Sequence, residues 1–146
     1  MTTRILIADD QKTIRASLRD LLDQQTDMEV AAEAADGHTA LALARKLAPD
    51  IVIMDIVMPT LNGIEATRQI KLEAPAVKII ALTMYRDTQY VKGMLEAGAS
   101  GYLLKNSAFE ELAQAIRAVT TGQSYLGLGV QNSAAEKSIS AIENCP

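Results

Sequence analysis

The sequence predicts an α/β fold in which a five-stranded parallel sheet is covered by helices on both faces. Short apolar runs alternate along the chain with longer segments whose apolar residues recur at helical spacing. One of these runs, 51–54, is apolar at every position, which is typical of a parallel strand buried on both faces. Five strand–helix units in succession imply right-handed crossovers, and five strands suit the flavodoxin-like order 2-1-3-4-5.

Five apolar runs are the expected strands. They lie at residues 5–8, 28–34, 51–54, 77–82 and 101–104. Glu29 and Glu33 interrupt the second run, which indicates that this strand lies at the sheet edge. In the expected order the first and third strands are neighbours at the point where the winding reverses. Ligands of such sheets bind there, at the carboxyl ends of the strands.

The expected helices are marked by apolar spacing and by capping residues. One helix spans 11–24, with an apolar face formed by Ile14, Leu18, Leu21 and Leu22, and another spans about 63–73. Asp36 and Asp87 can cap two more helices. Ser107 followed by Glu110 has the pattern of a capping box for the last helix. The apolar face of that helix, which should end near Gly122, is expected to contain Phe109, Leu112, Ala113, Ile116 and Val119.

The 146 residues fit one compact domain, which we expect at 1–122. Residues 123–146 are rich in Ser, Ala, Gly and Asn and have weak periodicity, so they are interpreted as a linker or C-terminal tail with at most one short helix around 134–143. The net charge of −4 argues against a free-standing nucleic-acid binder. One Cys and one His exclude an intramolecular disulfide and a multi-histidine metal site. No signal peptide or apolar run long enough for a bilayer is found, which predicts a cytoplasmic protein without membrane contact.

Polar residues gather where four of the predicted strands end. The set is Asp9, Asp10, Asp55, Thr83 and Lys105. Taken singly, an Asp after a strand is often a helix cap, a lysine is usually solvated and a threonine can simply end a strand. Because parallel strands end at the same edge, these residues are expected to meet. Clustered carboxylates favour a bound Mg²⁺, and a carboxylate can serve as a phosphoryl-accepting nucleophile. A lysine and a hydroxyl can then contact phosphate oxygens, so the set predicts a phosphoryl-accepting site centred on Asp55.

Five segments together resemble the receiver domain of bacterial two-component response regulators. They are residues 5–10, 54–59, 62–63, 81–84 and 101–105, within a stretch from 4 to about 122. The resemblance implies a CheY-like fold with Asp55 as the phosphoacceptor. It also implies that Mg²⁺ is held by Asp10, Asp55 and the backbone carbonyl of Val57, with Asp9 acting through a metal-bound water.

The resemblance further implies a switch and a phosphodonor. Lys105 and Thr83 would contact the phosphoryl group, while Thr83 and Tyr102 would form the pair that reports it. Without the resemblance, Tyr102 is equally well explained as a half-buried strand aromatic. The donor would be a phosphohistidine on a sensor histidine kinase. The chain would catalyse only its own phosphorylation and dephosphorylation, and would thus not be an enzyme in the usual sense.

Two segments resemble the NarL/FixJ subgroup, whose receivers usually precede a LuxR-type helix-turn-helix DNA-binding domain. They are residues 82–84 and 102–107. No helix-turn-helix follows within the 146 residues, so any contact with DNA would need a domain that is not in this chain. A piece of a longer transcriptional regulator is the favoured interpretation, because residues 123–146 have a linker-like composition. A stand-alone receiver acting by protein–protein interaction stays open. Members of the subgroup often form homodimers, but nothing in the sequence selects an interface.

Other phosphate-handling proteins fit the sequence less well. A haloacid-dehalogenase-type phosphatase needs two aspartates separated by one residue after the first strand, whereas Asp9 and Asp10 are adjacent. A flavodoxin-type electron carrier needs a phosphate-binding loop at the same place, where two carboxylates would repel the flavin phosphate. A P-loop nucleotide-binding protein needs a Gly-x4-Gly-Lys-Ser/Thr motif, which is absent.

Overall fold

A computed structural model describes residues 2–84 and 88–127. The strands are β1 (Thr3–Ala8), β2 (Met28–Ala34), β3 (Ile51–Met54), β4 (Lys78–Thr83), β5 (Gly101–Leu104) and β6 (Tyr125–Leu126). The helices are α1 (Lys12–Asp23), α2 (Gly37–Leu47), α3 (Gly63–Glu73), α4 (Thr88–Ala97) and α5 (Ala108–Thr120). Strands and helices alternate as the sequence predicts, and the α/β fold class is confirmed. The expected cap Asp87 and the short helix expected around 134–143 lie outside the described residues.

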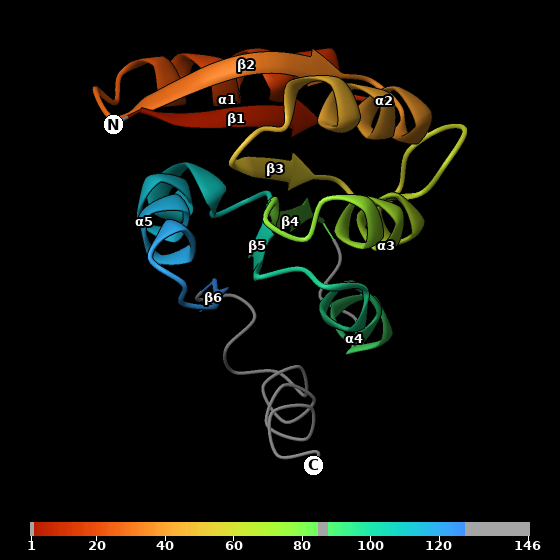
Figure 1. The fold of residues 1–146 in the computed structure, drawn as a ribbon. Helices are drawn as coiled ribbons and strands as arrows, with labels where there is room; N and C mark the ends of the chain where they lie inside the picture. The colour runs from red at the N-terminus through yellow and green to blue at the C-terminus, as the bar shows by residue number, and fades with distance from the viewer. Residues whose placement is uncertain (1, 85–87, 128–146) are drawn as a thin grey trace.

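Within the described residues the sheet has six strands in the order β2-β1-β3-β4-β5-β6, and every neighbouring pair is parallel. The expected order 2-1-3-4-5 is confirmed for the first five strands, with β2 at the edge (Figure 1). The sixth strand was not predicted. It lies within the range interpreted as a linker or tail and has only two residues, which is too short for a periodic pattern.

The helices cover both faces of the sheet, as predicted (Figure 1). On one face, α1 and α5 pack against side chains such as Ile5 and Ile7 of β1. On the other face, α2, α3 and α4 pack against alternate side chains such as Leu6 and Ala8. Because successive strand residues point to opposite faces, β1 serves both layers of the core at once. This double burial explains why the buried runs 5–8 and 51–54 of the central strands are apolar at every position.

Side chains cap the N-termini of α2 and α3, but no side chain caps the N-terminus of α5. The expected cap Asp36 is confirmed, since its Oδ1 accepts a hydrogen bond from the backbone N–H of Thr39 at 2.8 Å. Asn62 caps α3 in the same way through the N–H of Glu65. The capping box predicted at Ser107 is wrong, because its side chain makes no cap bond. Instead the Ser107 hydroxyl donates to the carbonyl of Leu104 at 3.4 Å.

The apolar face expected for α5 is wrong at one position. Phe109 is 47% exposed, whereas Ala108 beside it is buried. The buried stripe is Ala108, Leu112, Ala115, Ile116 and Val119. It shares Leu112, Ile116 and Val119 with the predicted face but is turned toward the side of Ala108 and Ala115. The helix orientation is set by its contacts with α1 and the sheet.

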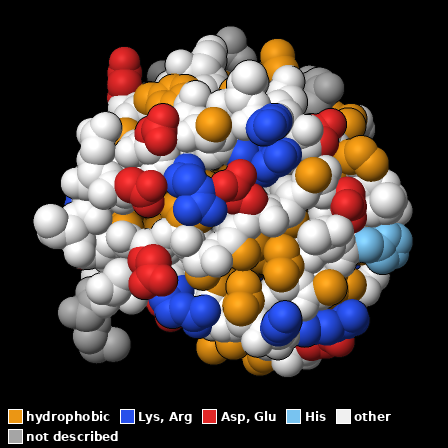
Figure 2. Space-filling view, turned by 90° about the horizontal axis from the view of Figure 1, so that it is seen from above, with side chains coloured by type: hydrophobic (Ala, Val, Ile, Leu, Met, Phe, Trp, Pro, Cys, Tyr) orange, Lys and Arg blue, Asp and Glu red, His pale blue; other side chains and the backbone are white. Residues whose placement is uncertain are grey.

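Figure 2 shows the molecule from above relative to Figure 1, and on this face positively and negatively charged side chains lie close together. Lys and Arg side chains alternate there with Asp and Glu side chains, and hydrophobic atoms are visible between them. Ion pairs among the described residues include Arg19 with Glu33 and Arg45 with Glu73. This face does not present the basic patch that nucleic-acid binding requires. No helix in the described part of the chain is both long and apolar enough to cross a membrane.

Candidate functional site

Backbone hydrogen bonds bring the predicted site residues to one edge of the sheet. Asp9 follows β1 and Asp55 follows β3, and these strands are direct neighbours with Ala8 opposite Met54. The Asp55 N–H donates to the carbonyl of Ala8 at 2.9 Å, which continues the strand ladder by one residue. In the same way the Lys105 N–H donates to the carbonyl of Thr83 at 2.8 Å. The predicted meeting of these strand ends is therefore present in the structure.

Three carboxylates form a cluster at this edge. Oxygen atoms of Asp9, Asp10 and Asp55 all lie within 4.8 Å of one another. Asp9 and Asp55 are buried, with Asp55 only 5% exposed, while Asp10 is open to solvent. Burial first, and the nearby charge of Asp9 second, raise the pKa of Asp55 to about 6, although Lys105 opposes this shift. Asp55 is therefore ionised at neutral pH but more basic than an ordinary aspartate.

Lys105 lies between the two buried carboxylates. Its Nζ is 2.8 Å from Oδ2 of Asp9 and 3.1 Å from Oδ2 of Asp55. Burial alone would lower the pKa of Lys105, but its close contacts with Asp9 and Asp55, and the negative charges of both, outweigh burial and raise this pKa. The ammonium therefore stays charged and offsets part of the negative charge of the cluster.

The donor atoms of the cluster suit a hard divalent cation. All three side chains offer carboxylate oxygens, which Mg²⁺ prefers, and the exposed position of Asp10 leaves room for the waters that Mg²⁺ keeps. Oδ2 of Asp9 is buried and accepts no hydrogen bond of good geometry from the described residues, despite its ion pair with Lys105. Its lone pairs are thus available to a cation or a cation-bound water. Val57 lies two residues after Asp55 with 49% of its surface exposed, in the loop before α3.

Thr83 and Tyr102 lie in neighbouring strands below the cluster. Thr83 is buried at the end of β4, where Leu104 is its register partner in β5. Tyr102 is fully buried, not half-buried as a plain strand aromatic would be, and it packs in the core layer under α2, α3 and α4. Strand alternation from Ala81 places Thr83 on this same face of the sheet. Both predicted switch residues therefore face one layer of helices.

Gly63 permits α3 to begin directly against the phosphoacceptor candidate. A Cβ at this position would lie 2.0 Å from the carbonyl oxygen of Asp55. The Gly63 N–H donates to the carbonyl of Ile56 at 2.7 Å, which closes the loop between β3 and α3. Only glycine fits this close approach of two backbone segments, so residue 63 contributes to the position of Asp55.

The comparison with known families agrees with this geometry. Residues 5–117 match the model of the response regulator receiver domain. The chain belongs to this family. The predicted resemblance to receivers is thereby confirmed, together with their role as phosphoacceptors in two-component signalling.

Similar receivers are found in transcriptional regulators. Over 120 residues the chain is 46% identical to the transcriptional regulatory protein LiaR and 45% identical to the uncharacterized transcriptional regulatory protein YxjL, both of Bacillus subtilis (strain 168). These 120 residues are 82% of this chain, 57% of LiaR and 55% of YxjL, so the receiver spans somewhat more than half the length of either relative.

The fold is also that of a solved regulator from the predicted subgroup. The crystal structure of a two-component response regulator of the LuxR family from Aurantimonas sp. SI85-9A1 has a TM-score of 0.88 and 38% identity to this chain. The match covers 95% of this chain and 99% of that structure. The expected NarL/FixJ, or LuxR-type, subgroup is thereby confirmed.

Two residues that contact the receiver site were not singled out from the sequence. The backbone N–H of Gln11 donates to Oδ1 of Asp9 at 2.8 Å, and its side-chain Oε1 accepts from Lys105 Nζ at 3.0 Å. Arg15 reaches the carbonyl of Asp9 from α1. The spacing of Gln11 and Arg15 is i, i+4, which places both on one face of the helix that follows the aspartates, and this signal could have found them.

Proposed function

We propose that Asp55 is the phosphoacceptor of this receiver and that a phosphohistidine on a sensor histidine kinase is the donor. The observation that carries this proposal is the environment of Asp55, which is buried beside Asp9 and held 3.1 Å from Lys105. A carboxylate oxygen of Asp55 attacks the phosphorus atom, the P–N bond breaks, and the electron pair leaves with the imidazole. The raised pKa of Asp55 makes this carboxylate more basic, which favours nucleophilic attack at neutral pH.

The neighbouring residues have separate tasks in this proposal. Asp10, Asp55 and the Val57 carbonyl would hold Mg²⁺ directly, and Asp9 would hold it through a water. When bound, the cation offsets the negative charge of the carboxylates and of the phosphoryl oxygens. Lys105 leaves its ion pairs to contact a phosphoryl oxygen. The receiver turns over no separate substrate and catalyses only its own phosphorylation and dephosphorylation.

The proposed readout passes through Thr83 and Tyr102. Thr83 donates its hydroxyl to the phosphoryl group, and the repacking of the shared core layer is reported by Tyr102 to α4 and β5. The receiver occupies 1–122 and acts in the cytoplasm. The output is transcription through a DNA-binding domain, as the names of LiaR and YxjL support, and dimerisation of the receiver can contribute to it. A stand-alone receiver that acts by protein–protein contact is the second candidate.

Acetyl phosphate tests the phosphoacceptor directly. Incubation of the protein with acetyl phosphate and Mg²⁺, followed by intact mass spectrometry, should show one phosphoryl adduct that is lost in Asp55→Asn. Asp50→Asn is the matched control, since it removes an exposed carboxylate at the opposite end of β3. An adduct that persists in Asp55→Asn would refute the assignment, as would its complete absence in the wild-type protein.

A further inference from the structure

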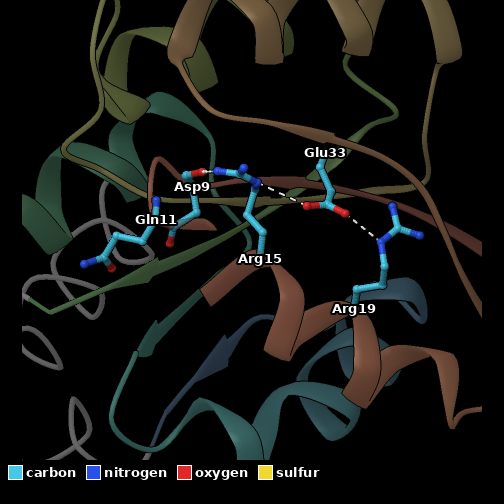
Figure 3. Close-up of polar contacts among 5 residues, drawn as sticks. All are labelled: Asp9, Gln11, Arg15, Arg19 and Glu33. Carbon is cyan, nitrogen blue, oxygen red and sulfur yellow. Dashed lines mark hydrogen bonds and ion pairs between the residues drawn. The ribbon is translucent and has the colours of Figure 1, made fainter. Parts of the chain in front are cut away.

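Arg15 of α1 connects the carboxylate cluster to the edge strand β2 (Figure 3). Its Nη1 donates to the backbone carbonyl of Asp9 at 2.7 Å, and its Nε donates to Oε1 of Glu33 at 3.1 Å. We propose that Arg15 is a positioning residue that holds the Asp9–Asp10 segment in the geometry that binds Mg²⁺, and that Glu33 aligns its guanidinium. This inference rests on the proposed role of the two aspartates in Mg²⁺ binding.

The contact with Arg15 completes the restraint of Asp9. The N–H of Asp9 donates to the carbonyl of Ala34 at 3.0 Å, and Oδ1 accepts from the N–H of Gln11 at 2.8 Å. Oδ2 lies 2.8 Å from Lys105 Nζ. The carbonyl is the remaining polar group, and Arg15 binds it. Three polar groups of Asp9 are therefore held by hydrogen bonds, Oδ2 has an ion pair, and the carbonyl is the group held by a side chain from α1.

The carbonyl of Asp9 also determines where Asp10 lies. The peptide unit is planar, so the Asp9 carbonyl and the Cα atom of Asp10 belong to one rigid group. Fixing the direction of this carbonyl therefore fixes the point from which the Asp10 side chain starts. The Asp10 side chain is exposed to solvent. Its position is consequently inherited from the peptide unit that Arg15 holds.

Glu33 supplies the second half of the arrangement. The guanidinium is a planar fork, so binding Nε at Glu33 sets the direction in which Nη1 points. The carboxylate also offsets the positive charge of Arg15, which would otherwise compete with a cation at the cluster. Arg19 binds the other oxygen, with its Nε 2.6 Å from Oε2 of Glu33. Figure 3 shows Arg19 on the side of Glu33 away from Asp9.

The sign of the effect separates positioning from simple electrostatics. Removal of a cation beside a metal site should by charge alone strengthen Mg²⁺ binding. Loss of a positioning contact should weaken it, typically by about 10-fold or more for groups that orient metal ligands. Arg19→Ala is the matched control, because it breaks an ion pair with the same carboxylate but removes no contact with Asp9.

The experiment is an isothermal titration calorimetry measurement in which Mg²⁺ alone, without a phosphodonor, is added to the protein. We expect the Kd of Arg15→Ala for Mg²⁺ to rise about 10-fold, that of Arg19→Ala to stay near the wild-type value, and Arg15→Lys to fall between them because one ammonium cannot bind both partners. Asp10→Asn tests the underlying site and should lose most binding. Wild-type-like binding by Asp10→Asn would refute the proposed Mg²⁺ ligands, whereas its loss together with unchanged binding by Arg15→Ala would refute the positioning role alone.

A purely structural role for Arg15 predicts a different pattern. In that case Arg15→Ala and Arg19→Ala would weaken Mg²⁺ binding in proportion to their loss of stability, which urea unfolding without Mg²⁺ measures. Equal effects of the two variants on Kd would overturn the inference. Should Arg15→Ala fail to fold, Arg15→Lys and Glu33→Gln replace it, and both must then bind Mg²⁺ more weakly than Arg19→Ala for the inference to stand.

Discussion

Asp55→Asn should stabilise the fold when Mg²⁺ is absent, although it removes the proposed phosphoacceptor. Asp55 has a pKa of about 6 in the folded chain and an ordinary value of 3.8 otherwise. The folded state therefore favours the neutral carboxyl, and asparagine is neutral at every pH. At about 1.4 kcal/mol per pKa unit, the difference between 3.8 and about 6 means that the ionised Asp55 lowers the free energy of unfolding by about 3 kcal/mol.

The sign of the pH dependence follows from the raised pKa. Below pH 3.8 the carboxyl is neutral in both the folded and the unfolded state, so the free-energy cost of keeping an ionised Asp55 in the folded protein is absent. Between 3.8 and about 6 the folded state holds the proton more tightly, and the wild-type protein loses stability as pH rises through this window. Above that window the whole cost is present. The advantage of Asp55→Asn should be about 3 kcal/mol at pH 8 and about half as large at pH 5.

Urea unfolding in the presence of a chelator, followed by circular dichroism, measures this difference. Asp50→Asn serves as the control, because Asp50 lies at the other end of β3 and its Oδ2 accepts a hydrogen bond from the N–H of Arg4 at 2.8 Å. It should give no stabilisation. Added Mg²⁺ should stabilise the wild-type protein and narrow its gap to Asp55→Asn. A wild-type protein that equals or exceeds Asp55→Asn in stability at pH 8 without Mg²⁺ would show that burial and charge repulsion at Asp55 are not as described.

Three substitutions at residues other than the carboxylates, and one surface control, probe how the fold holds the site. Gly63→Ala should lower the free energy of unfolding in urea by about 3 kcal/mol, because the added Cβ would lie 2.0 Å from the backbone oxygen of Asp55. It should also slow phosphorylation by acetyl phosphate. An unchanged urea midpoint would contradict this close approach. Tyr125→Phe should cost about 1 kcal/mol by the same measurement, since the Tyr125 hydroxyl donates to Oε1 of the buried Glu111 at 3.1 Å, and no loss would mean that this bond does not hold β6. Leu22→Ala should cost about 3 kcal/mol in the α1 core, whereas Leu72→Ala, 78% exposed, should be nearly neutral; similar losses would refute the assigned burial.

The sequence predicted those features that depend on regular spacing. The runs 5–8 of β1 and 51–54 of β3 are apolar at every position, and the residues that follow them are acidic, so parallel winding alone brings Asp9 and Asp55 together. The edge position of β2 was predicted from Glu29 and Glu33. One reason for Glu33 at that position is visible only in the structure, where it binds the two arginines of α1.

Features that depend on contacts between distant residues could not be predicted. Arg15 and Glu33 are 18 positions apart and lie on different elements, so no local pattern relates them. Strand β6 exists because Tyr125 and Gly127 donate backbone hydrogen bonds to the carbonyls of Ser100 and Tyr102. The rotation of α5, which exposes Phe109, is likewise set by what the helix packs against. These are tertiary effects that override local propensity.

The way in which the site residues are held explains why a charge change at this edge can have distant effects. The backbone of Asp9 is bonded to β2, that of Asp55 to β1 and that of Lys105 to β4. The carboxylates therefore cannot relieve their repulsion by moving apart without breaking the strand ladder. The cost of about 3 kcal/mol at Asp55 is instead retained in the folded state, as is common at functional sites. A cation or phosphoryl group that changes this charge balance acts on side chains such as Lys105 and on the core layer of Thr83, because the strand ends themselves cannot yield.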